Sequence, residues 1–419
     1  MEIKVHGTLK GEVTPPPSKS QAHRLLICAA LGNEPCTIAC SSTNADIVAT
    51  MRSLNALGAS IEYNGGVFAV TPVQPCKGGT LDCGESGSTL RFLVPVAAAL
   101  GADATFVGSG KLPTRPMDAL CRVLVEHGVA VHKHCENAEL PMSCNGTLQG
   151  GRYTLPGNIS SQYLTGLLFA LPLAADDSEI DIVGGLASAS YVDMTIDALR
   201  AAGVQVTRRG DSYSIKGGSR YSLPGNVVVE ADWSSAAFWI VAGVVGKRPI
   251  TVRGCNIDSL QGDRRIIDHL RSMGAYIDIT PEGVVAMPSQ LFGAELDCED
   301  TPDLVPILSV AAAVASGETL FTNVGRLRYK ESDRLAAMQA VLASFGVHST
   351  IGEDTFTVVG GEPVALSPVD SFGDHRIAMS AAVMSTVATG VTTICGAECV
   401  AKSYPSFFED FAALGGSVY

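Results

Sequence analysis

A unit of about seventy residues returns six times along this chain of 419 residues. Each copy opens an apolar helix with polar or charged side chains. Because a repeat of this length is one supersecondary unit that must stack on its neighbours, it constrains the fold more than any other feature. The six openings are Ser18-Lys19-Ser20, Ser86-Gly87-Ser88, Ser160-Ser161-Gln162, Trp233-Ser234-Ser235, Pro302-Asp303 and Asp374-His375-Arg376.

Each copy continues into a second helix that ends at a glycine directly before a strand. Glycine in the left-handed conformation is the usual residue after the end of a helix, so all six are predicted to be helix C-caps. These glycines are Gly58, Gly128, Gly203, Gly274, Gly346 and Gly415.

After each glycine the pattern changes to alternation of apolar and polar residues, and Asn64-Gly65 is a typical hairpin turn. Each copy is therefore predicted to fold as a β-α-β-α-β-β unit in a mixed α/β (α+β) protein. Three units on each side predict two similar lobes, with the active site in the cleft between them.

The last copy stops before its second hairpin strand, whereas the opening sequence MEIKVHG alternates like a strand. We expect the N-terminal strand to complete the last unit. The predicted lobes are residues 18–222 and residues 1–17 plus 223–419, with one crossing near residues 15–17 and the other within residues 217–226.

Composition limits the class of protein. Hydrophobic residues make up 46% of the chain and charged residues 17%, which is typical of a packed globular protein. The net charge of -13 makes nucleic acid and anionic membrane surfaces poor partners. The 12 cysteines form no C-x-x-C pair, and the N-terminus has no signal-peptide pattern, so we expect a cytoplasmic protein without structural zinc.

Cations recur at the helix openings and in nearby loops of this acidic chain. A helix N-terminus favours anions, and cations placed beside it imply a substrate with several negative charges. Taken singly, Lys19 and Arg24 also fit a capped helix with two solvated bases, and Arg91 could reach out to water. Lys330 and Arg334 are predicted to share a helical face and also fit a salt-bridged surface helix, and Asp303 could be an N-cap or a base. The cations are Lys19, Arg24, Arg91, Arg115, Lys330, Arg334, Arg376 and Lys402.

Nine segments, in order, resemble the EPSP synthase family of enolpyruvyl transferases. The resemblance extends from about residue 5 to residue 415. The segments are SKSxxxR (18–24), GxxGSTLR (84–91), RP (115–116), SSQYLTGLL (160–168), QGD (261–263), PD (302–303), LRYKESDRL (327–335), GDHRIAM (373–379) and AKSYP (401–405).

This resemblance implies transfer of the enolpyruvyl group of phosphoenolpyruvate to the 5-hydroxyl of shikimate 3-phosphate, without a metal or organic cofactor. It implies that shikimate 3-phosphate is held by Lys19, Ser20, Arg24, Ser160, Ser161, Gln162, Ser188, Tyr191, Asp303 and Lys330. It implies that phosphoenolpyruvate is held by Lys19, Gly87, Arg115, Gln162, Arg334, Arg376 and Lys402.

The reaction needs protons to move onto the methylene carbon and off the hydroxyl. Asp303 and Glu331, together with Lys19 or Lys402, are the candidates for this acid–base chemistry. The chain departs from the family pattern at Glu85, Ala189-Ser190 and Arg326.

Two alternatives stay open. The sister transferase acting on UDP-N-acetylglucosamine has the same six-unit fold, but its loop cysteine has no counterpart in residues 110–118. A non-enzymatic repeat protein that binds phosphorylated ligands would not need Asp303 and Glu331. The expected partners are the small molecules shikimate 3-phosphate and phosphoenolpyruvate, and the expected state is a monomer.

Overall fold

The computed structural model describes residues 1–419, and contacts divide them into two units, Pro17–Val229 and Met1–Pro16 with Glu230–Tyr419. The chain therefore crosses between the units at residues 16–17 and 229–230. The second crossing lies seven residues beyond the boundary drawn from the sequence. The reason is a short strand at Asn226–Val228, which pairs in parallel with Cys36–Ala39 of the first unit.

Six sheets of four strands carry the fold, one for each repeat. In every sheet two strands run parallel, and the second of them also pairs antiparallel with a further strand. In four of the sheets a helix connects the two parallel strands along the chain, whereas in the first and fourth repeats the first strand comes from residues 226–228 and 11–13. The predicted β-α-β-α-β-β repeat and mixed α/β class are therefore confirmed. A parallel pair needs such a helical crossover, which explains why each repeat is so long.

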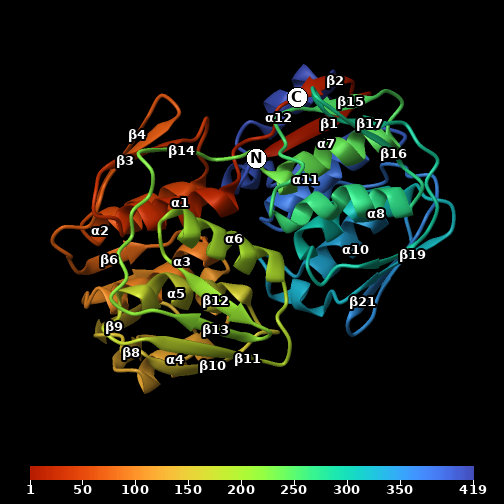
Figure 1. Cartoon of the computed structure of the whole chain (residues 1–419). Helices are drawn as coiled ribbons and strands as arrows, with labels where there is room; N and C mark the ends of the chain where they lie inside the picture. Colours follow the sequence, from red (N-terminus) through yellow and green to blue (C-terminus); the bar gives the residue numbers. More distant parts are fainter. The chain divides into compact units, whose positions relative to one another are not determined.

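The Pro17–Val229 unit contains the first three repeats (Figure 1). The first is β14 (Asn226–Val228), α1 (Lys19–Ala30), β3 (Cys36–Ala39), α2 (Ala45–Ala56), β4 (Ser60–Asn64) and β5 (Val67–Thr71). The second is β6 (Gly79–Asp82), α3 (Gly87–Ala99), β7 (Ala104–Val107), α4 (Asp118–Glu126), β8 (Val129–Lys133) and β9 (Met142–Gly146). The third is β10 (Gly151–Pro156), α5 (Ser161–Ala170), β11 (Ser178–Val183), α6 (Ala189–Ala201), β12 (Val206–Arg209) and β13 (Ser212–Ile215).

The other unit contains the last three repeats. The fourth is β2 (Gly11–Val13), α7 (Trp233–Val245), β15 (Ile250–Val252), α8 (Ile266–Ser272), β16 (Tyr276–Thr280) and β17 (Gly283–Met287). The fifth is β18 (Glu295–Asp297), α9 (Val305–Ala313), β19 (Glu318–Thr322), α10 (Arg334–Ser344), β20 (Ser349–Ile351) and β21 (Thr355–Val359). The sixth is β22 (Val369–Asp370), α11 (His375–Met384), β23 (Thr392–Cys395), α12 (Phe407–Ala413), β24 (Gly416–Val418) and β1 (Glu2–Gly7).

Strand β1 lies between β23 and β24 and is antiparallel to both. Val5 is opposite Thr392 on one side and Val418 on the other, and it is fully buried. The first residues of the chain thus take the place of the second hairpin strand that the last repeat lacks. Strand β2 likewise supplies the first strand of the fourth repeat, parallel to β15.

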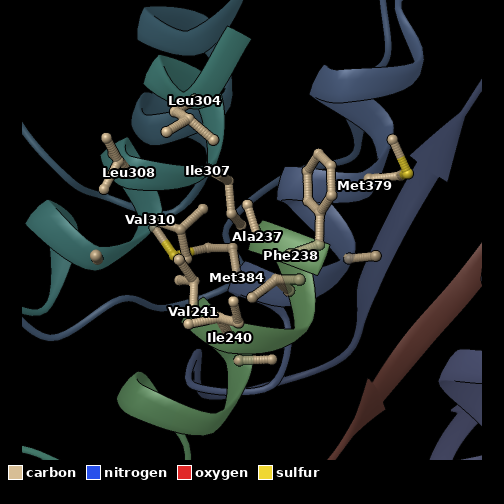
Figure 2. Close-up of a cluster of buried hydrophobic side chains, with 14 of the residues drawn as sticks. Ala237, Phe238, Ile240, Val241, Leu304, Ile307, Leu308, Val310, Met379 and Met384 are labelled. Carbon is tan, nitrogen blue, oxygen red and sulfur yellow. The ribbon is translucent and has the colours of Figure 1, made fainter. Parts of the chain in front are cut away.

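Each unit has its own apolar core, built around the first helix of each repeat. In the unit that contains residues 230–419, helices α7, α9 and α11 contact one another, and Phe238, Ile307 and Met384 belong to the cluster drawn in Figure 2. In the Pro17–Val229 unit, α3 and α5 lie side by side (Figure 1). Helices that are apolar on nearly every side are typical of such a central position. None of the helices is both long and apolar enough to cross a membrane.

The six predicted helix C-caps are confirmed. All six glycines predicted as C-caps have a positive φ, from 72° at Gly346 to 110° at Gly58. Five of the six first helices have a side chain that accepts a backbone N–H at the N-terminus: Ser18, Ser86, Ser160, Asp232 and Asp374. Helix α9 is the exception, because a 3₁₀ turn at Pro302–Leu304 precedes it.

Candidate active site

Lys19 is the first residue of α1, and its charge is paired within the same unit. Its Nζ lies 2.9 Å from Oδ2 of Asp46, which is in the first turn of α2. Both side chains are mostly buried, so this pair holds the amine more firmly than a surface ion pair would. Asp46 was not singled out from the sequence, because an acid in the first turn of a helix is common for structural reasons alone.

Arg24 is 2% exposed, and its described hydrogen bonds all go to uncharged oxygens. Nε donates to Thr195 Oγ1 at 2.9 Å, Nη1 to the Ser20 carbonyl at 2.6 Å and Nη2 to the Tyr191 carbonyl at 2.7 Å. Burial lowers the pKa of Arg24 to about 10, while Tyr191 and Cys28 oppose that shift. A buried cation whose partners are neutral is suited to binding an anionic ligand.

Gly87 opens α3 directly beneath the guanidinium of Arg115. A Cβ added at Gly87 would lie 2.8 Å from Nη1 of Arg115, closer than side chains pack. Arg115 follows a short 3₁₀ turn at Leu112–Thr114 and is 8% exposed. The missing side chain at Gly87 therefore leaves room for the guanidinium of Arg115, whereas the family resemblance implied only that Gly87 helps to hold phosphoenolpyruvate.

Arg91 is not a solvated base at the head of α3. It is 5% exposed and donates to the side chain of Gln162 and to the carbonyl of Pro116. Its described donors thus go to the protein itself. The option that it reaches out to water is wrong.

The serines and the tyrosine predicted in the third repeat lie at the heads of α5 and α6. Ser160 caps α5, and Ser161 is the first residue of that helix. Ser188 precedes α6 with φ 57° and ψ 49°, a left-handed conformation that is strained for a residue other than glycine. The Tyr191 carbonyl, one turn later, accepts the bond from Arg24. Strain of this kind is typical of positions held for function.

In the other unit, Arg334 at the start of α10 is surrounded by three carboxylates. Nη1 donates to Asp303 Oδ1 at 2.7 Å, Nη2 to Glu331 Oε2 at 2.8 Å and Nε to Asp374 Oδ2 at 2.8 Å. The side chain is 2% exposed. Burial alone would disfavour its charge, but Asp374, Glu331 and Asp303 outweigh burial and raise the pKa of Arg334.

Asp303 is itself held by three cations. Besides Arg334, Lys330 Nζ lies 3.3 Å from Oδ1, and Arg376 Nη2 lies 2.9 Å from Oδ2. Asp303 lies within the 3₁₀ turn before α9 and does not cap that helix. The N-cap interpretation of Asp303 is therefore wrong.

Lys330 reaches Asp303 from a loop. The sequence suggested a helical face shared by Lys330 and Arg334, but α10 begins only at Arg334, and Lys330 follows a 3₁₀ turn in an extended conformation. That helical argument is wrong, although both cations do bind Asp303. Burial lowers the pKa of Lys330 to about 8; Asp303 opposes this shift and Arg334 adds to it.

Two further acids complete this group. Asp374 caps α11, is fully buried and pairs with Arg334; burial opposes its charge, but Arg334 outweighs burial and lowers the pKa of Asp374. Asp263 is 1% exposed and accepts from the Ser234 hydroxyl. Burial and the nearby charge of Asp303 raise the pKa of Asp263 to about 7, against the influence of Arg376. Only tertiary packing brings these acids to the cations.

Lys402 ends a 3₁₀ helix at Ala397–Lys402, and its Nζ donates to the Gly373 carbonyl at 2.8 Å. Phe372, immediately before that glycine, has φ 53°, which is strained for a bulky residue. The loop in front of α11 is thus held in an unfavourable conformation beside Asp374 and Arg376. The structure contains no group of three His, Cys, Asp or Glu side chains arranged to hold a metal ion.

Two of the three departures from the family pattern have visible contacts. The carboxylate of Glu85 lies against Gly110, where an added Cβ would be 2.2 Å from Oε2. Arg326 donates from Nη2 to the Glu299 carbonyl. Ala189 opens α6, and nothing in the structure explains the small residue there.

Comparison with known proteins gives one consistent result. The family model of EPSP synthase (3-phosphoshikimate 1-carboxyvinyltransferase) matches residues 3–411. A 3-phosphoshikimate 1-carboxyvinyltransferase of Clostridium kluyveri is 43% identical over 415 residues, with 98% of this chain and 96% of that protein covered. One of Clostridium acetobutylicum is 41% identical over 422 residues, with the same shares covered.

Solved structures agree. The EPSP synthase of Acinetobacter baumannii has a TM-score of 0.82 at 27% identity, covering 100% of this chain and 99% of that one. The enolpyruvyl transferase NikO of Streptomyces tendae, at 18% identity and a TM-score of 0.78, shares the fold. From the family match over nearly the whole length and the two close relatives, we conclude that the chain belongs to the EPSP synthase family.

Proposed function

We propose that this protein transfers the enolpyruvyl group of phosphoenolpyruvate to the 5-hydroxyl of shikimate 3-phosphate. The hydroxyl oxygen bonds to C2 of phosphoenolpyruvate while C3 gains a proton and the hydroxyl loses one. Phosphate then leaves C2 and C3 gives up a proton, which restores the double bond. The observation that carries the proposal is the ion cluster around Asp303 and Arg334, where three acids and three cations converge in a chain of this family.

Substrate charge accounts for the cations. Shikimate 3-phosphate and phosphoenolpyruvate each carry a phosphate and a carboxylate, and charge-assisted hydrogen bonds to such groups are strong when water is excluded. Arg24 has neutral partners and is assigned to shikimate 3-phosphate. The side chains assigned to this substrate are Lys19, Ser20, Arg24, Ser160, Ser161, Gln162, Ser188, Tyr191, Asp303 and Lys330.

Phosphoenolpyruvate is assigned to the arginines of stiff or strained segments. Arg115 is held against Gly87, and Arg376 follows the strained loop at Phe372. The residues assigned to this substrate are Lys19, Gly87, Arg115, Gln162, Arg334, Arg376 and Lys402.

Proton transfer is assigned to Asp303 and Glu331, with Lys19 or Lys402 as the partner acid. One guanidinium, that of Arg334, holds both carboxylates through its two Nη atoms. Arg334 thereby sets the distance between the two proposed bases before any substrate binds. Preorganised groups of this kind need no rearrangement at the moment of reaction.

One experiment tests the proposal against its rivals. Phosphate release from phosphoenolpyruvate is measured with shikimate 3-phosphate, with UDP-N-acetylglucosamine and with neither acceptor. We expect release with shikimate 3-phosphate only. Release with the sugar nucleotide would replace the proposed acceptor, and binding of phosphorylated ligands without release would support a non-enzymatic protein.

A further inference from the structure

The side chain of Arg91 lies where three segments of the Pro17–Val229 unit meet. From α3, Nη1 donates to Gln162 Oε1 on α5 at 2.8 Å, and Nη2 donates to the Pro116 carbonyl at 3.0 Å. The guanidinium also lies over the ring of Tyr163, 5.5 Å from its centroid. Burying an arginine costs free energy unless its donors are hydrogen-bonded, so these two bonds are needed to keep Arg91 in this position.

The first consequence concerns the amide of Gln162. An arginine can only donate hydrogen bonds, so the oxygen of Gln162 must face Arg91. Its nitrogen then faces Ser88 and donates to that hydroxyl at 3.0 Å. The amide is thus held in one of its two flipped orientations, and its nitrogen keeps a second hydrogen for a ligand.

The second consequence concerns the segment that carries Arg115. The carbonyl of Pro116 accepts from Arg91 and also from the Tyr163 hydroxyl, at 2.6 Å. Pro116 directly follows Arg115, whose guanidinium is packed on Gly87. This carbonyl is therefore tied to both α3 and α5, and the position of Arg115 depends on it.

We infer that Arg91 is a positioning residue, which orients the Gln162 amide and anchors the Arg115 segment for phosphoenolpyruvate without being a ligand itself. This inference rests on the proposed function, in which Gln162 is assigned to both substrates and Arg115 to phosphoenolpyruvate alone. Lysine cannot replace Arg91 fully, since a single ammonium group lacks the planar fork that reaches two acceptors at once.

The test compares Arg91→Met and Arg91→Lys with Arg200→Met, a matched change at an exposed arginine on α6. A displacement of about 1 Å in a substrate-positioning group can cost about 100-fold. We expect kcat/KM for phosphoenolpyruvate to fall about 10- to 100-fold in Arg91→Met, with a smaller change for shikimate 3-phosphate and an intermediate loss in Arg91→Lys. Equal losses for both substrates, or a loss explained by partial unfolding in thermal denaturation, would overturn the inference.

A double variant tests the route of the effect. If Arg91 acts through Gln162, Arg91→Met should lower kcat/KM for phosphoenolpyruvate much less in a Gln162→Ala background than in the unchanged protein. Independent sites combine to within about twofold. If the loss in the double variant equals the product of the two single losses to within about twofold, Arg91 does not act through Gln162.

A measurement without turnover separates this inference from the proposed function. In protein labelled with ¹⁵N-glutamine, the side-chain amide signal of Gln162 is identified by Gln162→Glu. We expect this signal to move towards the position of an exposed glutamine in Arg91→Met and to stay in place in Arg200→Met. An unmoved signal would refute the orienting role, whichever substrates the protein uses.

Discussion

Arg334 Nη1 donates a hydrogen bond of 2.7 Å to Asp303 Oδ1, so the proposed base is ion-paired within its own unit. The same guanidinium binds Glu331 and Asp374. Because one buried cation connects three acids, changes to the individual acids should have different consequences.

Asp303→Asn should lower kcat by about 100-fold or more, because a positioned general base contributes about 10²–10⁴-fold. The amide keeps the shape of the carboxylate but cannot accept the proton. Phosphate release under saturating substrates measures the effect.

The comparison variant is Asp374→Asn, which removes a fully buried partner of Arg334. Breaking a buried ion pair costs about 3–5 kcal/mol. The free energy of unfolding should therefore be lower in Asp374→Asn than in Asp303→Asn. Near-normal turnover in Asp303→Asn would exclude the residue from the chemistry.

Binding of shikimate 3-phosphate should weaken as the pH rises through about 8. Burial lowers the pKa of Lys330 to about 8, so raising the pH removes its charge, and an anion then loses a partner. At pH 9 about one tenth of an isolated group with this pKa would stay charged. Calorimetric titration at pH 6.5 and pH 9 measures the change, and Lys330→Arg, which stays charged, should lack it.

Gly87→Ala should weaken phosphoenolpyruvate more than shikimate 3-phosphate. The added methyl would lie 2.8 Å from Nη1 of Arg115 and would push that guanidinium aside. Because the displaced atoms are the end of a flexible chain, stability should change little. Gly225→Ala is the control, since a Cβ there meets nothing within 4 Å. An unchanged KM for phosphoenolpyruvate would argue against the assigned role of Arg115.

Asp263 should make the protein less stable as the pH rises from about 4 towards 7. Its pKa is raised to about 7 in the folded state, chiefly by burial, so the folded protein binds more protons than the unfolded chain in this range. Urea unfolding of Asp263→Asn should therefore show a weaker decline between pH 5 and pH 7.5. Asp258→Asn, at an exposed position, should behave like the unchanged protein.

Val5→Ala should destabilise the unit that contains residues 230–419 by about 1–3 kcal/mol, because it leaves a cavity beneath a central strand. Hydrogen exchange should accelerate in that unit, above all in β23 and β24. Val228→Ala, at a largely exposed position, should change little. Faster exchange confined to residues 17–229 would contradict the role of β1.

The sequence by itself determined the repeat, the glycines that end the second helix of each repeat, and the family. The six glycines and the polar residues Ser18, Ser86, Ser160 and Asp374 at the helix openings act within a few residues of their own helix, so their pattern is readable locally. The missing strand of the last repeat could be located because a sheet needs a partner of the right alternation, and MEIKVHG has it.

Only the tertiary structure decided which charges meet. Asp46 pairs with Lys19, and Asp374 with Arg334, across 27 and 40 residues of sequence. Lys330 reaches Asp303 from a loop where a helix was expected, and Arg91 faces Gln162 although it carries a charge suited to substrate. Such pairings follow from how whole repeats pack, because a side chain's partner depends on elements far along the chain, which no local pattern records.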